Sequence, residues 1–273
     1  MSAHGVLLCD KPAGVTSHDV VAGVRRRLEG RAKVGHAGTL DPFATGLLLV
    51  LVGRATRVQR FLMALPKRYE VVAQFGAVSS TGDPEGAVEV TGRVPCGDLA
   101  LPVGRLWQRP PAYSAVKVGG RRAYALARAG ETVELAEREV TVHRFEETWR
   151  SGDRRGFVIE CSSGTYVRSL IAELGDAYCL ELRRTRIGSF DVGDASQERL
   201  IGLDEALGFL PAVRLDEETA TRAAHGRRLT DVPDLPDLRP GAVARLLDDG
   251  GLIALAQVED ESGQLRPIVG FRG

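Results

Sequence analysis

Residues 35–46 read GHAGTLDPFATG and run directly into the apolar stretch LLLVLV at residues 47–52. Glycine and proline occupy four of the first twelve positions, so we predict that residues 35–46 form no regular element. The six residues that follow are short, apolar and branched, which favours a buried strand. The stretch therefore predicts a carboxylate, Asp41, on a loop that leads into a buried sheet, where reactive groups are often presented.

Strands and helices alternate irregularly over the rest of the chain. Residues 5–10 read as a buried strand that ends in the turn KPAG at residues 11–14. Thr16 and Asp19 form a helix-start signal, and Gly30 ends that helix. We predict further strands at residues 68–76, 140–142 and 157–161, and a helix capped by Thr165. Because strict strand–helix–strand order is missing, we expect an α+β fold with a large mixed or mainly antiparallel sheet.

The composition changes after residue 210. Residues 211–240 hold four prolines and many charges, which predicts a linker or a sheet edge. Residues 242–247, 252–258 and 265–271 read as strands that are separated by the turn sequences DDGG and SG. We therefore expect a small C-terminal β domain.

The formal net charge of the 273 residues is zero, which is unusual for a protein that binds nucleic acid. The charge is uneven, however: residues 1–210 carry +3 and residues 211–273 carry −3. Basic residues also cluster at positions 25–33, 54–68 and 183–186. Each cluster alone is explained as a solvated face, but the three together favour a phosphate-binding surface.

Several classes of protein are disfavoured. No apolar run approaches the roughly 20 residues of a membrane-spanning helix, and the first residues do not have the pattern of a signal peptide. The four cysteines show no C-x-x-C spacing, and the five histidines form no metal-binding pattern. We therefore expect a cytoplasmic protein with no membrane association, disulfide or structural metal.

Asp41 stands directly before Pro42, and an aspartate before a proline is also typical of an ordinary turn without a reactive group. A phosphoryl-transfer site is disfavoured, because no G-K-[ST] ending and no second aspartate at D-x-D spacing are present. A nucleotide-cofactor enzyme lacks its G-x-G-x-x-G fingerprint after a strand. From the residues alone, a turn and a reactive carboxylate both remain open.

Residues 35–46 resemble the catalytic loop of the tRNA pseudouridine synthase B family. Further segments resemble the other motifs of that family, at residues 10–19, 67–69, 114–124, 161–168 and 182–185. These motifs appear in the family's order over about residues 5–210, and several motifs in order are far more specific than one.

The resemblance implies the pseudouridine synthase fold and an isomerase that converts uridine 55, in the T-arm of tRNA, to pseudouridine. The base is flipped out, its glycosidic bond changes from C–N to C–C, and no cofactor or metal is required. Asp41 matches the catalytic nucleophile of the family. Its route stays open, because a carboxylate can attack C1′ of the ribose, attack C6 of the base, or deprotonate C2′.

The resemblance also implies the rest of the site. Arg168 matches a catalytic arginine, and a neighbouring cation favours the ionised carboxylate. Tyr69 matches a tyrosine that stacks on the flipped base and whose hydroxyl can serve in proton transfer. His36, Tyr166 and Leu182 match further substrate-binding positions.

A basic segment near residues 105–130 matches an RNA-binding insertion of the family. The residues expected to contact RNA are Lys11, Lys117, Arg121, Arg122, Arg183 and Arg184. The implied domains are a catalytic domain over residues 1–212 and a small C-terminal domain over residues 213–273. The latter resembles an RNA-binding β-barrel, although its net charge is negative. We expect a monomer whose partner is the T-arm stem-loop of tRNA.

Two other functions remain open. A tRNA-binding or tRNA-folding protein on the same scaffold would need no catalysis, but it would have no use for Asp41, Tyr69 and Arg168 together. A relative that is guided by partner proteins and RNA is the other alternative, and the short chain without basic tails favours the stand-alone form. The chain also departs from the family near residues 175–180, where it is shorter than expected.

Overall fold

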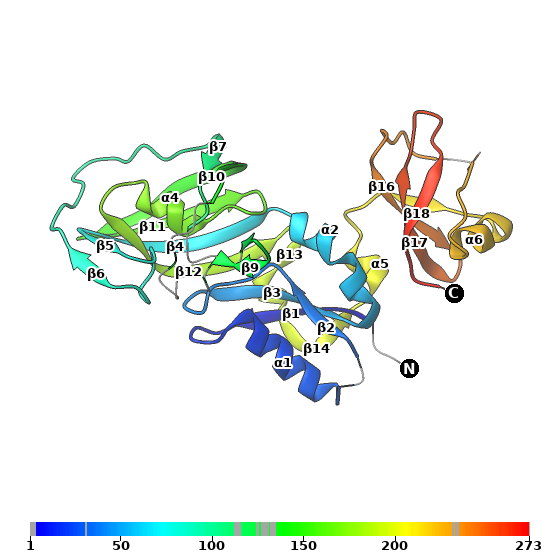
Figure 1. The fold of residues 1–273 in the computed structure, drawn as a ribbon, viewed down its shortest axis with the longest axis horizontal. Helices are drawn as coiled ribbons and strands as arrows, with labels where there is room; N and C mark the ends of the chain where they lie inside the picture. The colour runs from blue at the N-terminus through cyan, green and yellow to red at the C-terminus, as the bar shows by residue number, and fades with distance from the viewer. Residues whose placement is uncertain are drawn as a thin grey trace.

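The computed structural model describes residues 4–30, 32–111, 116–123, 126, 131, 135–230, 232 and 235–272. A ten-stranded sheet dominates the first part of the chain, and a separate four-stranded sheet follows near the C-terminus (Figure 1). The strands of the large sheet are β1 (Gly5–Lys11), β2 (Val34–Ala37), β3 (Thr45–Val52), β4 (Lys67–Phe75), β7 (Gly104–Gln108), β10 (Arg138–Ser151), β11 (Arg154–Cys161), β12 (Ala177–Ile187), β13 (Phe190–Asp191) and β14 (Ser196–Ile201).

The strand order in this sheet is β14-β1-β3-β12-β4-β11-β10-β7, with β2 on β3 and β13 on β12. The pairs are antiparallel except for a short parallel contact between β3 and β12. The predicted α+β fold with a large mixed sheet is therefore confirmed. β3 is almost completely buried, as its unbroken apolar sequence predicts for a strand that is covered on both faces.

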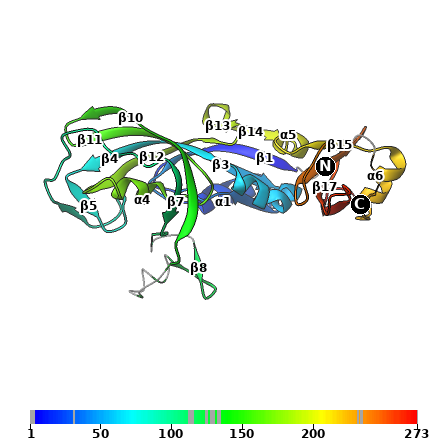
Figure 2. The same cartoon turned by 90° about the horizontal axis from the view of Figure 1, so that it is seen from above.

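The helices of this part are α1 (Ser17–Arg27), α2 (Gln59–Ala64), α4 (Val167–Ala172) and α5 (Leu203–Ala206), with the 3₁₀ turns η1 (Gly53–Val58) and η2 (Val192–Asp194). Helices α1 and α4 lie on the same side of the large sheet (Figure 2). The predicted start of α1 is confirmed, because Thr16 and Asp19 form a reciprocal capping box. The predicted cap of α4 is wrong: Tyr166, not Thr165, is its N-cap, and no side chain of the cap bonds the helix.

The prediction that residues 35–46 contain no regular element is wrong at both ends, since Thr45 and Gly46 already belong to β3. Gly35 to Ala37 belong to β2, which pairs with β3. The pairing of β12 with β3 covers only Thr45 and Gly46, so the edge of β3 beyond that point accommodates β2. The loop that carries Asp41 is consequently shorter than the sequence suggests.

Two short hairpins accompany the large sheet. They are formed by β5 (Ala77–Ser79) with β6 (Val88–Val90) and by β8 (Lys117–Val118) with β9 (Arg121–Arg122). The β8–β9 hairpin projects from the side of the sheet that carries α1 and α4 (Figure 2). None of the helices in the described part of the chain is long and apolar enough to cross a membrane.

The C-terminal sheet has the order β15-β16-β17-β18, and its elements are β15 (Ala212–Arg214), α6 (Glu217–Ala224), β16 (Val243–Asp248), β17 (Gly251–Val258) and β18 (Leu265–Gly270). The predicted linker over residues 211–240 is thus wrong in part, since β15 and α6 belong to this unit. The expected barrel is also wrong, because no pairing between β15 and β18 closes the sheet in the described residues. Helix α6 covers the sheet instead, through Ala220 and Ala223 in its apolar cluster.

The two sheets share an apolar cluster. Leu255 and Phe271 of the C-terminal unit pack with Val6, Val58 and Leu207 of the large one. Two arginines of the 54–68 cluster also point to this junction, where Arg57 donates to the carbonyl of Gly270 at 2.9 Å and Arg54 to that of Phe271. These two arginines therefore also join the two units, and the phosphate-binding surface expected of their cluster stays a prediction.

Candidate active site

Asp41 and Arg168 meet beside the large sheet. Asp41 lies on the loop between β2 and β3, and Arg168 is the second residue of α4. Arg168 Nε lies 3.0 Å from Asp41 Oδ2, and the Asp41 side chain remains 36% exposed while that of Arg168 is 5% exposed. The structure thus brings together the two residues that were expected to form the catalytic ion pair, with the carboxylate on the solvent side.

A second carboxylate, Asp83, completes this arrangement. Its Oδ2 lies 2.8 Å from Arg168 Nη1, which also donates to the carbonyl of Thr81 at 2.7 Å. The other oxygen of Asp83 accepts from Thr81 Oγ1 at 2.5 Å and from the backbone N–H of Glu85 at 3.1 Å. Arg168 is therefore held from behind by Asp83 while it faces Asp41.

Sequence reasoning did not single out Asp83. The one signal that could have found it is the pair Asp83-Pro84, which repeats the Asp41-Pro42 pair of the catalytic loop. Burial distinguishes the two, because the Asp83 side chain is 5% exposed. Asp83 is thus placed to position Arg168, and Asp41 to meet a substrate.

The electrostatics of Asp41 reflect opposing neighbours. Burial raises the pKa of its carboxyl above the usual range, and Asp83 adds to that rise. The Arg168 guanidinium opposes it most strongly, followed by Lys11 and Arg184. Arg168 therefore favours the ionised carboxylate, in the direction that a cationic partner at 3.0 Å requires.

The backbone on both sides of Asp41 is fixed by buried polar groups. Ser17 Oγ accepts from the N–H of Leu40 at 2.9 Å and donates to the carbonyl of the same residue at 3.1 Å. On the other side, Lys11 Nζ at 3.1 Å and the N–H of Gly14 at 2.9 Å donate to the carbonyl of Pro42. Residues 11–17 thus act as a clamp that holds the loop in one conformation.

Lys11 is fully buried, and its ammonium group donates to the carbonyls of Pro12, Val15 and Pro42. All three of its N–H groups therefore have partners inside the protein. This placement argues against the RNA contact that was expected for Lys11, because a phosphate cannot reach the ammonium group. Lys11 and Ser17 are positioning residues for the loop.

Arg184 is likewise only 1% exposed. Its guanidinium donates to the carbonyls of Leu47 at 2.8 Å, Gly38 at 3.0 Å and Thr39 at 3.4 Å. The expected RNA contact of Arg184 is contradicted for the same reason as that of Lys11. Gly46 makes this packing possible, since its φ is +102° and a Cβ there would lie 2.2 Å from the Arg184 carbonyl oxygen.

Arg183 has the opposite orientation. Its side chain is 39% exposed and forms an ion pair with Asp10, with Nη2 2.7 Å from Oδ2. It also borders a surface cavity of about 700 Å³ whose lining includes Phe43, Thr45 and Leu182. Arg183 therefore remains available at the surface near the catalytic loop.

Tyr69 and Leu182 lie in one apolar cluster with Leu40, the residue before Asp41. Tyr69 is 8% exposed, and it stands opposite Arg184 in the β4–β12 pair. Burial raises the pKa of the Tyr69 hydroxyl, and Arg184 opposes the rise through its charge and a hydrogen bond. The hydroxyl is therefore neutral at physiological pH and beside the catalytic loop.

The remaining expected residues lie around this centre. Tyr166 is the residue before α4, two positions from Arg168. His36 is in β2, and its carbonyl accepts from Gln59 Nε2 at 2.7 Å. Arg121 is exposed and pairs with Glu131, with Nη2 2.9 Å from Oε1. The side chains of Lys117 and Arg122, and residues 114, 115 and 124 of the central motif, lie outside what the structure describes.

No group of three or more histidine, cysteine, aspartate or glutamate side chains that could hold a metal ion occurs in the described ranges. The charged groups around Asp41 are instead the ion pairs of Arg168 and the buried cations Lys11 and Arg184. What the arrangement offers chemically is a fixed, partly exposed carboxylate with a cation behind it.

Residues 25–167 match the model of the TruB family pseudouridylate synthase (N terminal domain), which covers more than half of the chain. The chain belongs to this family. A tRNA pseudouridine synthase B of Thermobifida fusca (strain YX) is 44% identical, over 99% of both chains. That of Nocardia farcinica (strain IFM 10152) is 43% identical, over 97% of this chain and 92% of its own. This TruB family member is therefore an isomerase that converts uridine to pseudouridine.

Solved structures share the fold of this TruB family member. A chain in a Cbf5-Nop10-Gar1 complex superposes with a TM-score of 0.67 at 25% identity, over 98% of this chain and 84% of its own. A chain of an H/ACA RNP bound to a substrate RNA containing 2′-deoxyuridine gives a TM-score of 0.69 at 23% identity, over the same shares. The pseudouridine synthase fold that the sequence predicted is confirmed.

Proposed function

We propose that the chain isomerises uridine 55 in the T-arm of tRNA to pseudouridine, with Asp41 as the nucleophile. The observation that carries the proposal is the 3.0 Å ion pair between Asp41 and Arg168, on a loop whose backbone is clamped on both sides. A protein that only binds tRNA would need no partly exposed carboxylate that is preorganised in this way. The names of the relatives from T. fusca and N. farcinica supply the tRNA substrate.

The reaction exchanges one bond for another. The bond between ribose C1′ and N1 of uracil breaks, the base turns, and a bond between C1′ and C5 forms. The proton that C5 loses is replaced at N1, so no redox partner is needed. Asp41 can begin this sequence by attack at C1′, by attack at C6, or by taking the C2′ proton.

We assign supporting roles to the neighbours of Asp41. Arg168 keeps the carboxylate ionised and correctly oriented, and Asp83 fixes Arg168. Tyr69 stacks on the flipped base and serves in proton transfer at C5, and His36, Tyr166 and Leu182 shape the pocket around it. The closeness of Tyr69 and Leu182 to the residue before Asp41 supports these roles.

RNA recognition is assigned to the basic insertion and to exposed cations near the loop. Arg121 and Arg183 are exposed, and exposed arginines suit backbone phosphates. We propose that residues 1–212 form the catalytic unit, including this insertion, and that residues 213–273 form a second unit. We also propose that the protein acts as a cytoplasmic monomer.

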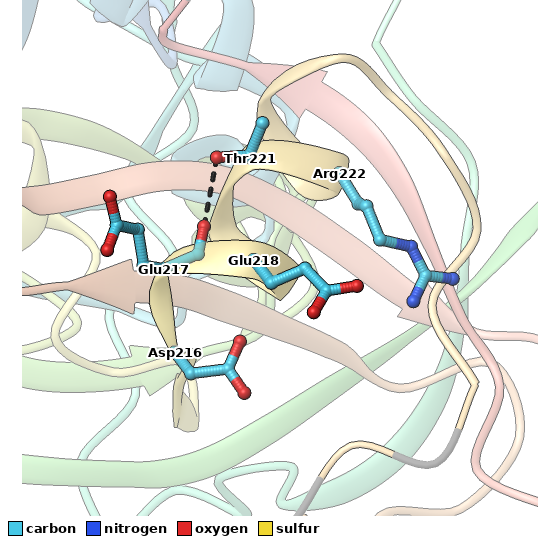
Figure 3. Close-up of a pocket in the computed structure, with 5 residues that line it drawn as sticks. All are labelled: Asp216, Glu217, Glu218, Thr221 and Arg222. Atoms are coloured by element: carbon cyan, nitrogen blue, oxygen red, sulfur yellow. Dashed lines mark hydrogen bonds between the residues drawn. The ribbon is translucent and has the colours of Figure 1, made fainter.

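The C-terminal unit offers little for a phosphate at α6. A cavity there is lined by Asp216, Glu217, Glu218, Thr221 and Arg222 (Figure 3). The carboxylates have a structural reason, because Asp216 accepts from the N–H of Thr219 at 2.8 Å and acidic residues stabilise a helix N-terminus. This face repels a polyanion, so we assign the C-terminal unit a buttressing role.

The deciding experiment is tritium release from tRNA labelled at C5 of uridine, in which the T-arm uridine is the only candidate. Wild type should release tritium without an added metal or cofactor, and Asp41→Asn should lower the rate at least about 1000-fold, because the nucleophile is lost. Its affinity for tRNA should stay within about 3-fold of wild type.

Glu217→Gln is the matched control, since it also replaces an exposed carboxylate by an amide but lies on α6, and it should retain the wild-type rate. Retained turnover by Asp41→Asn would remove Asp41 from the mechanism. Tight tRNA binding by a wild type that releases no tritium would favour the binding-protein alternative.

A further inference from the structure

Two residues mark the point at which the basic insertion leaves the large sheet. β7 ends at Gln108 and β10 begins at Arg138, and these two residues are direct partners in the antiparallel pair. The chain leaves the sheet after the first and returns at the second, and the β8–β9 hairpin between them projects away from the sheet (Figure 2). We call Gln108 and Arg138 the insertion neck.

Both residues of the insertion neck hold the segment before α4. Gln108 is 2% exposed, its Nε2 donates to the carbonyl of Tyr166 at 3.0 Å, and its Oε1 accepts from the N–H of Tyr166 at 2.7 Å. Its side-chain amide thus pairs with Tyr166 as a neighbouring strand would. Arg138 places its guanidinium 4.8 Å from the centre of the Tyr166 ring and donates to the carbonyl of Gly164.

The segment that the insertion neck holds leads directly to Arg168. Tyr166 is the N-cap of α4, and Arg168 follows two residues later. No side chain of the cap bonds the helix, so Gln108 supplies the side-chain bonds of the Tyr166 backbone, whose carbonyl also accepts from the N–H of Leu170 at 3.2 Å. A displacement of the neck therefore moves Tyr166, the start of α4 and the guanidinium that lies 3.0 Å from Asp41.

We propose that the insertion neck sets the geometry of the Arg168–Asp41 pair, with Gln108 and Arg138 as positioning residues that act through Tyr166. The inference rests on the proposed function and adds two residues outside the expected site. Neither neck residue touches the reacting atoms.

The first test replaces Gln108 with methionine, which has a similar shape but cannot make the two hydrogen bonds. The single-turnover rate at saturating tRNA should fall about 10- to 100-fold, as expected when the segment that carries Arg168 loses two of its hydrogen bonds. The dissociation constant for tRNA should stay within about 3-fold of wild type, since the contacts of the insertion remain. Gln257→Met is the matched control, because Gln257 Nε2 also donates to a backbone carbonyl, that of Gly241 at 3.1 Å, but lies half-buried on β17 of the C-terminal unit.

The second test asks whether Gln108 acts through Arg168. In an Arg168→Lys background, Gln108→Met should lower the rate less than about 3-fold, because residues that act in one network are not additive. Full additivity of the two losses would overturn the inference, as would an unchanged rate in Gln108→Met. A parallel loss of rate and tRNA affinity would overturn it too, since it would indicate general loosening.

A third readout does not depend on activity. The charged groups that face Asp41 are Arg168, Asp83, Lys11 and Arg184, and a misplaced Arg168 weakens the strongest influence that lowers the pKa of Asp41. Carbon-13 NMR of labelled aspartate carboxyls should therefore show a higher pKa for Asp41 in Gln108→Met than in wild type or Gln257→Met. An unchanged pKa of Asp41 in Gln108→Met would contradict the positioning role, whether or not wild type acts on tRNA. A wild type that is inactive on tRNA would contradict the proposed function instead.

Discussion

The catalytic unit and the C-terminal unit place their cations differently. Among the described residues, the fully buried cations all belong to the large sheet, its loops and α4, and they are Lys11, Lys67, Arg155, Arg168 and Arg184. In the C-terminal unit, Arg228–Glu259 and Arg272–Asp248 are ion pairs with partly exposed side chains. Arg245, with a side chain 14% exposed, is the exception there, and it joins Asp204 of the first unit.

The difference shows what each unit requires. A buried cation costs several kcal/mol in desolvation unless its N–H groups are all paired, so it is kept only where the pairing is itself useful. Around Asp41 those pairs fix a loop that must hold one conformation. The C-terminal unit is held by an apolar cluster shared with the large sheet, and surface ion pairs add little to such packing.

The largest effect in this comparison is expected for Arg184→Met. It removes the donors for the carbonyls of Gly38, Thr39 and Leu47, and we expect the free energy of unfolding to fall by about 3 kcal/mol. Isomerisation should be lost as well, since the backbone around Asp41 is released. Urea unfolding curves and tritium release measure the two effects.

Arg272→Met makes the same change at the surface of the C-terminal unit, where the Arg272 side chain is 33% exposed. It should change stability far less and leave the rate unaltered. Equal losses for the two variants would show that burial does not decide the contribution of these cations.

A smaller effect is expected from Lys67, which shows the cost of a buried cation as a pH dependence. Its ammonium donates to the carbonyl of Leu65 at 2.5 Å and to that of Met63, and burial lowers its pKa from 10.5 to about 8. Between these values the unfolded chain binds more protons than the folded one, so stability rises with pH. The rise should be about 1 kcal/mol between pH 8 and pH 9.

Lys67→Met should abolish this rise while it retains the packing. The difference between the two proteins isolates Lys67, because burial raises the pKa of Cys161 from 9.0 to about 11 and that thiol lowers the stability of both proteins as the pH approaches and passes 9. Urea unfolding of both proteins at pH 7, 8 and 9 checks the prediction. A rise of equal size in Lys67→Met would assign it to another group.

Much of the fold could be predicted, because its signals are local. The run of six apolar residues at 47–52 predicted the central buried strand, and Thr16 with Asp19 predicted the helix start. The strand β2 was missed because the glycines at positions 35 and 38 suggest a loop. It pairs with the part of β3 that β12 leaves uncovered, and the sequence does not reveal where that part begins. The open C-terminal sheet could not be told from a barrel, since strand patterns do not reveal closure.

The site, like the fold, could be predicted only in part. Asp41 and Arg168 were expected from the family resemblance, and their ion pair is visible only in three dimensions. Lys11 and Arg184 were expected to contact RNA, because sequence alone does not distinguish a buried cation from an exposed one. Asp83 is signalled only by the Asp83-Pro84 pair, and Gln108 by nothing in the sequence, since each lies far along the chain from the residue that it contacts.

The smallest effect is expected at the acidic face of α6. Glu217→Lys with Glu218→Lys reverses two charges on the unit that carries −3 overall. If this unit only buttresses the catalytic one, no phosphate lies near α6, and tRNA affinity should change less than about 2-fold. The dependence of affinity on salt should also keep its slope, because no further counterions are released on binding.

Arg121→Glu on the insertion is the matched comparison, since it reverses one exposed charge where RNA contact is proposed. It should weaken binding and reduce the salt slope by about one ion. Filter binding at several salt concentrations measures both variants. A strong gain in affinity for the α6 variant would mean that the RNA backbone passes this face. The negative charge of the C-terminal unit would then weaken tRNA binding, instead of having no part in it.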